Sequence, residues 1–71
     1  MPLTIIQVGR IVKLVAVEAG GGLQGRLAAM GLVQGVEMEV LRNTPHGPFL
    51  IGVKGSRIML GRGMAQKIRV M

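Results

Sequence analysis

The side chains that could carry out catalysis are few in this sequence, and their spacing does not form a recognisable active site. There is one serine, Ser56, one histidine, His46, and neither cysteine nor aspartate. Nucleophilic catalysis needs a hydroxyl or thiol with a base in reach and a third group that orients the base. Glu37 and Glu39 alternate with apolar residues, so on a strand both carboxylates point into water rather than into a pocket suited to acid–base work. We therefore expect a non-enzymatic protein.

Metal ligands are equally scarce. A tight transition-metal site uses three or four His, Cys or carboxylate ligands, and the chain offers one histidine and three glutamates. We expect no metal and no other cofactor in a single copy, although His46 and a glutamate could be completed by a second copy. Of the six methionines, Met30, Met38 and Met59 fall at apolar positions, where packing in the core is expected, and Met64 is undecided.

The run Gly20-Gly21-Gly22 precedes a short apolar segment and superficially resembles a loop that cradles a phosphate. It lacks the lysine of a P-loop and the glycine spacing of a dinucleotide-binding motif. The run is therefore interpreted as a flexible turn that leads from a strand into a helix.

Positive charge is concentrated in the second half of the chain. The net charge is +6, yet residues 1–39 hold three basic and three acidic side chains, whereas residues 40–71 hold six basic and none acidic. Such a field favours an acidic protein surface, a nucleic acid or an anionic membrane as partner. Barrels that bind single strands stack bases on aromatic side chains, and the one aromatic residue, Phe49, is expected in the core. No specific nucleic acid is expected, and binding through phosphates alone is the alternative.

The elements that must position these residues fit into one small domain spanning residues 1–71. No cysteine is present to form a disulfide, and no uncharged apolar run approaches the roughly 20 residues that span a bilayer. Without a secretory signal pattern, the expected location is the cytoplasm.

The first half of the chain predicts one strand and one helix. Residues 10–17 are rich in valine, leucine and isoleucine, so a strand is expected, but apolar residues occupy both faces and its inward face is ambiguous. Residues 23–30 predict a short helix, in which Leu23, Leu27 and Met30 share one face and Leu27 anchors the helix to the sheet. Gly31 stands where a left-handed cap is wanted, and Leu32 can fold back on the last turn.

The second half alternates with a period of two, which is typical of strands with one buried face. The expected inward sets are Val36, Met38 and Val40, then Phe49, Ile51 and Val53, and finally Ile68 and Val70. Residues 44–48 predict a turn, residues 54–57 a tight hairpin, residues 58–60 a returning strand and residues 61–65 a bend. Five short strands and one short helix indicate a mainly β fold, a small and partly open barrel.

Four stretches, taken in order, make the chain similar to the FeoA family. They are Gly20-Gly21-Gly22-Leu23, the run Met30-Gly31-Leu32-Val33-Gln34-Gly35-Val36, the loop from Pro45 to Pro48, and the closing pattern of Gly55, Ile58, Leu60, Ala65, Ile68 and Val70. The resemblance covers essentially the whole chain and implies an SH3-like barrel with an inserted helix. The chain departs from the family pattern at Gly25, Gly61 and Gly63.

The resemblance also implies a function in ferrous iron transport. Proteins of this family are regarded as partners or regulators of a membrane ferrous iron permease that carries a cytoplasmic GTPase domain, rather than as iron carriers. Similar barrels form the C-terminal domain of iron- and manganese-dependent repressors, so a metal-sensing module is a further alternative.

Two surfaces are the candidates for docking on such a partner. One is the helix face around Gln24 and Arg26, and the other is the basic patch around Lys54, Arg57 and Arg62. We also expect an uncovered apolar surface on the first strand, where Ile11, Val15 and Val17 alternate with Val12, Leu14 and Ala16. A second copy of the chain could pair there, unless Leu3, Ile5 and Ile6 wrap over it.

Overall fold

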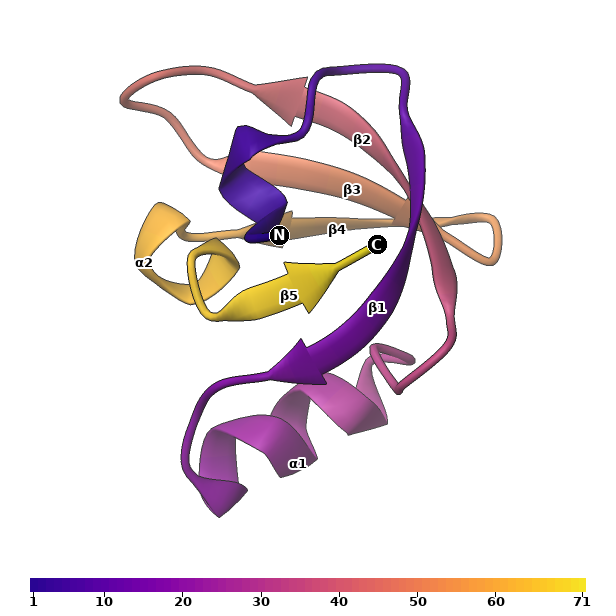
Figure 1. Ribbon diagram of the computed structural model, residues 1–71, viewed down its shortest axis with the longest axis vertical. Coiled ribbons are helices and arrows are strands. Elements are labelled where there is room, and N and C mark those ends of the chain that lie inside the picture. Colours follow the sequence, from indigo (N-terminus) through magenta and orange to yellow (C-terminus); the bar gives the residue numbers. More distant parts are fainter.

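The computed structural model describes all residues from 1 to 71 (Figure 1). In chain order, its elements are η1 (Leu3–Ile5, a 3-10 turn), β1 (Ile11–Val17), α1 (Gly21–Ala29), β2 (Glu37–Asn43), β3 (Phe49–Val53), β4 (Ser56–Leu60), α2 (Arg62–Ala65) and β5 (Ile68–Val70). The five expected strands are confirmed. The expectation of a single helix is wrong, because the segment expected to bend after Leu60 forms the one-turn helix α2. Its fully buried Ala65 shows that packing, rather than helix propensity, holds this turn.

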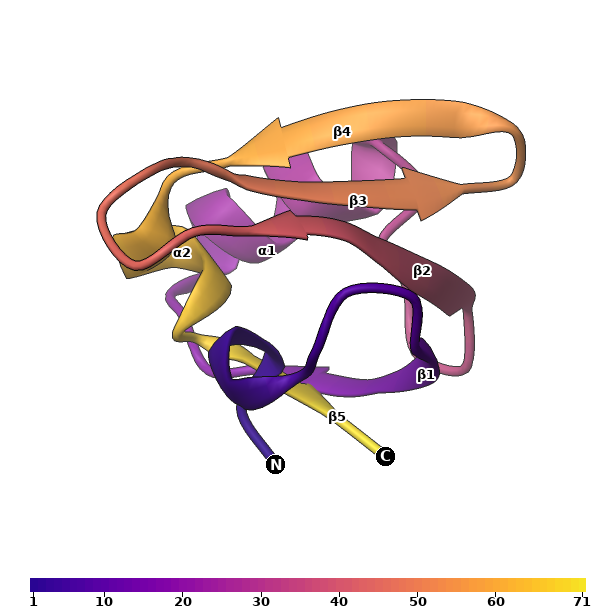
Figure 2. The same ribbon diagram turned by 90° about the horizontal axis from the view of Figure 1, so that it is seen from above.

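The five strands form one antiparallel sheet in the order β4-β3-β2-β1-β5. The sheet curls around the interior into a small, partly open barrel, and α1, inserted between β1 and β2, covers one end of it (Figures 1 and 2). This arrangement confirms the SH3-like barrel with an inserted helix.

A bulge in β1 resolves which face of this strand is buried. Val12 and Leu14 point inward and are 4% and 3% exposed, whereas Ile11 is 64% and Val15 37% exposed. The pairing with β5 shifts register between Leu14 and Ala16, so Val17 turns inward and packs against the core. The outer face of β1 therefore carries the uncovered apolar residues that the sequence predicts.

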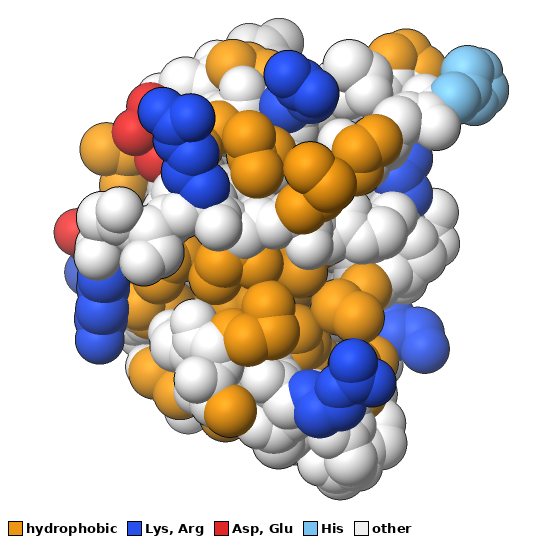
Figure 3. All heavy atoms as spheres, turned by 180° about the vertical axis from the view of Figure 1, so that it is seen from behind, with side chains coloured by type: hydrophobic (Ala, Val, Ile, Leu, Met, Phe, Trp, Pro, Cys, Tyr) orange, Lys and Arg blue, Asp and Glu red, His pale blue; other side chains and the backbone are white.

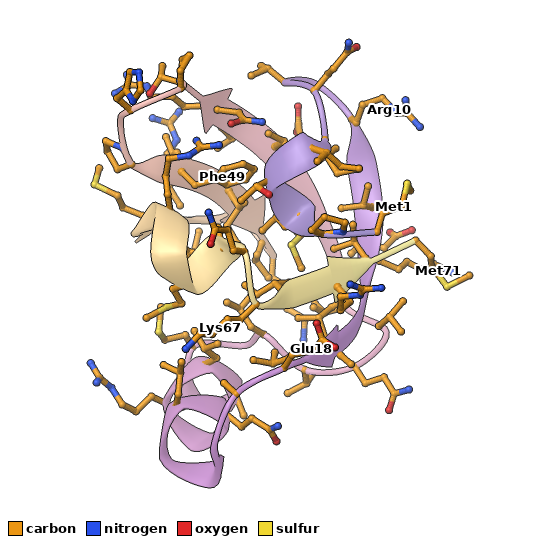
Figure 4. The ribbon with its side chains drawn as sticks, turned by 60° about the vertical axis from the view of Figure 1, so that its left-hand side comes forward. Met1, Arg10, Glu18, Phe49, Lys67 and Met71 are labelled. Atoms are coloured by element: carbon orange, nitrogen blue, oxygen red, sulfur yellow. The ribbon has the colours of Figure 1, made fainter.

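The core is one cluster of 16 buried residues, all of them hydrophobic. Phe49 is fully buried, between the strands and the η1 and α2 turns (Figure 4). The inward sets predicted for β2, β3 and β5 are confirmed, including Val36 just ahead of β2. The cluster consists of Leu3, Ile6, Val12, Leu14, Leu27, Leu32, Val36, Met38, Val40, Phe49, Ile51, Val53, Leu60, Ala65, Ile68 and Val70.

A Schellman cap ends α1 and determines which residues it buries. The N–H of Gly31, at φ +93°, donates to the Ala28 carbonyl at 2.9 Å, and the N–H of Leu32 donates to the Leu27 carbonyl at 2.9 Å. Leu27 and Leu32 are both buried, so the predicted anchor and cap are confirmed. The core position predicted for Met30 is wrong, because the reversal at Gly31 brings Leu32 onto Leu27 and leaves Met30 44% exposed.

The other methionines divide between the core and the surface. Met38 is 1% exposed, which confirms its core position. The same expectation is wrong for Met59, which is 62% exposed because it alternates with Ile58 and Leu60 and so lies on the outer face of β4. Met64 is half-buried and packs against the core.

The residues that precede β1 wrap over the barrel and cover the outer edge of β5. Leu3 and Ile6 are buried, whereas Ile5 is 61% exposed. The N–H of Val70 donates to the Met1 carbonyl at 2.7 Å, and Pro2 forms a bridge with Arg69. Leu3 and Ile6 thus fill part of the core, and they leave the outer face of β1 open.

Two glycines of the α1 region should respond to alanine in opposite directions. Gly31→Ala should lower the free energy of unfolding by about 1–2 kcal/mol, since an L side chain disfavours positive φ. Gly25→Ala should raise it by about 0.5–1 kcal/mol, since Gly25 lies inside the helix with open space around its missing Cβ. Thermal midpoints of the two variants measure both changes, at about 4–8 °C per kcal/mol in a domain of this size. A neutral Gly31→Ala would contradict the left-handed cap.

Candidate functional site

The tip of the β3–β4 hairpin presents two of the predicted docking residues together. Lys54 and Gly55 form its two-residue turn, with φ of +50° and +80°, a conformation that matches the twist of the two strands. Lys54 and Arg57 are both exposed, and neither forms an ion pair. Arg57 lies opposite Gly52 on β3, which has no side chain to cover it.

A shallow groove runs from this hairpin across the outer face of the sheet. Arg57, Gly52, Glu39 and Ile11 stand opposite one another on four neighbouring strands, so their outward positions form one row. Position 52 has little room for a side chain, since a Cβ there would lie 3.3 Å from Leu41 Cδ1. The glycine at this position therefore leaves the groove open. The groove is lined by Ile11, Glu37, Met38, Glu39, Leu41, Gly52, Lys54, Gly55, Ser56 and Arg57.

Arg62, the third residue of the predicted basic patch, lies at the opposite end of β4 and is engaged within the protein. Its Nη1 donates to Asn43 Oδ1 at 2.9 Å and to the Thr44 carbonyl at 2.6 Å. The Arg62 guanidinium carbon also lies 5.9 Å from the centre of the Phe49 ring, within the range of a cation–π contact. The structure therefore separates Arg62 from Lys54 and Arg57.

Asn43 completes this polar network, although no pattern in the sequence indicates its role. Its Nδ2 donates to the carbonyls of Thr4 at 3.0 Å and Ile6 at 2.9 Å, while its Oδ1 accepts from Arg62. One side chain thus joins η1, the end of β2 and the start of α2. Asparagine at the end of a strand is usually interpreted as a turn residue, so its position offered no signal of contacts with residues far away in the chain.

The two predicted residues of α1 differ in the same way. The Nε2 of Gln24 donates to the carbonyls of Val17 and Ala19, both at 2.9 Å, and so holds the loop between β1 and α1. Arg26 is exposed on the helix and forms no side-chain hydrogen bond or ion pair. Of the five predicted docking residues, the exposed side chains with no partner inside the protein are those of Arg26, Lys54 and Arg57.

The three acidic side chains lie on β2 and at the end of β1. Glu18 forms the one ion pair, with its Oε1 3.7 Å from Arg69 Nη1, at the end of β1 where its N–H also donates to the Lys67 carbonyl (Figure 4). Both side chains of this pair are about half exposed, so it contributes at most about 1 kcal/mol. Glu37 and Glu39 point outward from β2, as predicted.

Three further observations bear on the chemistry of the surface. No group of three His, Cys, Asp or Glu side chains lies close enough to hold a metal ion. Phe49 is fully buried and cannot stack on a base, which leaves phosphate contacts as the means of binding nucleic acid. No helix has the length and apolar character needed to cross a membrane.

Comparison with known proteins identifies a common family along the whole chain. The model of the FeoA domain matches residues 1–71. A protein of Methanocaldococcus jannaschii named "Putative Fe(2+) transport protein A" is 42% identical over 69 residues, which are 97% of this chain and 83% of that protein.

Solved structures agree with the family match. The crystal structure of an iron uptake regulatory protein, FeoA, has a TM-score of 0.88 and 32% identity, over 100% of this chain and 97% of that one. The FeoA protein of Chlorobium tepidum has a TM-score of 0.88 and 31% identity, over 99% of this chain and 68% of that one. A manganese-dependent transcriptional repressor, at 18% identity and a TM-score of 0.85, shares the fold over 96% of this chain and 39% of its own.

The network of Asn43 and Arg62 should stabilise the barrel as a coupled unit. Asn43→Ala should lower the free energy of unfolding by about 1–3 kcal/mol, because two carbonyls and the Arg62 guanidinium lose their partner. Urea denaturation of Asn43→Ala, Arg62→Ala and the double variant should give a coupling energy of at least about 0.5 kcal/mol. Arg57→Ala is the matched control, with an expected change within about 0.5 kcal/mol. Strictly additive effects would show that the two side chains act independently.

Proposed function

This chain belongs to the FeoA family and so to ferrous iron transport, and on that premise we propose that it acts as a non-enzymatic accessory protein. In this proposal it docks on the cytoplasmic, GTPase-bearing part of a membrane ferrous iron permease and works beside it in the cytoplasm. The family match, which extends along the whole chain, is the observation that carries the proposal.

The character of the exposed surface supports a docking role. Arg26, Lys54 and Arg57 form no ion pair within the chain, and apolar residues of the sheet such as Val15 and Met59 are exposed as well. A positive surface with apolar residues suits an acidic protein partner, because charge guides the encounter and apolar burial retains the complex. Gln24 and Arg62, which have partners within the chain, serve in this proposal to shape the surface.

The size of the molecule limits how much of it a partner can cover. A transient interface buries about 600 Å2 on each partner, and the accessible surface of this chain is 4302 Å2. Docking would thus use about one seventh of the surface. A footprint of this size corresponds to one face of the barrel, so we expect a weak and reversible complex.

Binding to the soluble cytoplasmic domain of the ferrous iron permease from the same organism tests the proposal. Isothermal titration calorimetry should give a micromolar dissociation constant that rises as sodium chloride increases from 0.05 to 0.5 M, since salt screens the exposed charges. A generic DNA duplex added in excess should not compete. Absence of binding at both salt concentrations would refute docking on this domain, and displacement by the duplex would favour the nucleic-acid alternative.

A further inference from the structure

The sheet has two edges, and the chain covers only one of them. Along β5, the N–H of Val70 donates to the Met1 carbonyl at 2.7 Å, and the amino group of Met1 donates to the Val70 carbonyl at 3.1 Å. At the other edge, β4 pairs with β3 alone, and no backbone hydrogen bond from a loop, turn or terminus reaches residues 56–60. We call the side of Ser56–Leu60 that faces away from β3 the β4 edge.

The β4 edge is regular and presents free backbone groups. Its pairing with β3 runs through five successive residues without a bulge, unlike the pairings of β1 with β5 and of β2 with β3. In a hairpin with a two-residue turn, Val53 and Ser56 exchange hydrogen bonds and the pattern then alternates. The N–H and C=O groups of Arg57 and Met59 therefore point away from β3 and can pair with an added strand.

An apolar side chain of β4 itself, Ile58, borders the β4 edge on the inner side of the sheet. Ile58 faces inward yet is only half-buried, because no strand lies beyond it. Leu23 of α1 and Met64 of α2 are also half-buried and pack against the core. From behind, hydrophobic side chains gather in a hollow between the strands and α1 (Figure 3). An added strand would direct every second side chain toward this hollow.

Charge determines what kind of strand the β4 edge accepts. Arg57 lies on the edge, Lys54 precedes it, Arg62 follows it, and Arg26 is exposed on α1. Two glutamates, Glu37 and Glu39, line the groove with Lys54 and Arg57. Both belong to β2, on the far side of β3, so they lie farther from the β4 edge than Arg57 does. A second copy of β4 would bring like charges together, which disfavours pairing between identical chains. An acidic strand would meet complementary charge.

We propose that the β4 edge accepts an extended segment of a partner protein as a sixth, terminal strand, in which acidic residues alternate with apolar ones. The apolar side chains of this segment enter the hollow beside Ile58, and its carboxylates lie on the outer side near Arg57. Main-chain hydrogen bonds to Arg57 and Met59 supply affinity, and the alternation supplies specificity. The proposal deepens the docking function above by naming the surface and the chemistry of the segment that binds it.

Two variants separate the backbone contribution from the charge. Met59→Pro removes an N–H that points away from β3, so the hairpin keeps its hydrogen bonds, as prolines on edge strands allow. Arg57→Glu reverses the charge, and Arg10→Glu is its matched control, an exposed arginine across the molecule from α1 (Figure 4). Thermal midpoints and amide NMR spectra of each variant establish that the barrel is intact.

The soluble cytoplasmic domain of the permease is the first probe. Met59→Pro and Arg57→Glu should each weaken its binding about fivefold or more, whereas Arg10→Glu should change it less than about twofold. If the wild-type chain binds and all three variants bind equally well, the β4 edge is not the docking surface, although the docking function stands.

A synthetic eight-residue peptide of alternating glutamate and valine is the second probe, and it tests the edge even if the permease domain does not bind. At millimolar peptide, exchange of the Arg57 and Met59 amide protons should slow by about tenfold, and a lysine–valine peptide should leave it unchanged. Equal effects of both peptides, or none from either, would overturn the proposal.

Discussion

The structure depends on closing a hydrophobic core with a single aromatic ring and otherwise aliphatic side chains. A chain of 71 residues buries a smaller share of its surface than a larger domain does, so every element has to contribute to the interior. Each strand and helix supplies at least one buried residue. Bulges in β1 and β2 let these short strands curl, and the bulge after Leu14 returns Val17 to the core. Phe49 lies where η1, α2 and the sheet meet, and Asn43 and Arg62 hold these turns in place around it.

The polar residues of this small domain fall into two groups. Gln24, Asn43 and Arg62 use their hydrogen-bonding groups on carbonyls and amides within the chain, where they fix turns that are too short to be stable alone. Arg26 and Arg57 have no such partner and remain available to another molecule. At one end of β4, the arginine side chain of Arg62 therefore stabilises the fold, whereas at the other end that of Arg57 stays exposed on the surface. The two arginines differ because Arg62 meets the Asn43 side chain and the Thr44 carbonyl, whereas Arg57 lies opposite Gly52, which has no side chain.

Much of the fold follows from local patterns in the sequence. Alternation identified the strands with one wet face, such as β2 and β3, and Gly31 identified the cap of α1, because each signal arises within a few residues. The sequence left open what depends on distant contacts. The bulge in β1 is set by pairing with β5, Met30 is displaced by Leu32, and the length of β4 separates Arg62 from Lys54. The open β4 edge, likewise, is visible only once the strand order is known.

The pairing of the first strand with the last has a consequence for how the chain folds. Strands β2, β3 and β4 follow one another and pair as neighbours, whereas β5 pairs with β1 at the other end of the chain, as in the pairing of Leu14 with Val70. Closing so large a loop is slow compared with forming hairpins. During synthesis the β2–β3–β4 meander can therefore assemble while the barrel stays open, until Ile68 and Val70 leave the ribosome. Pulse-labelled hydrogen exchange during refolding would reveal this order, with Ile51 protected before Val70. The core thus stays unsealed until β5 has been made and can pair with β1.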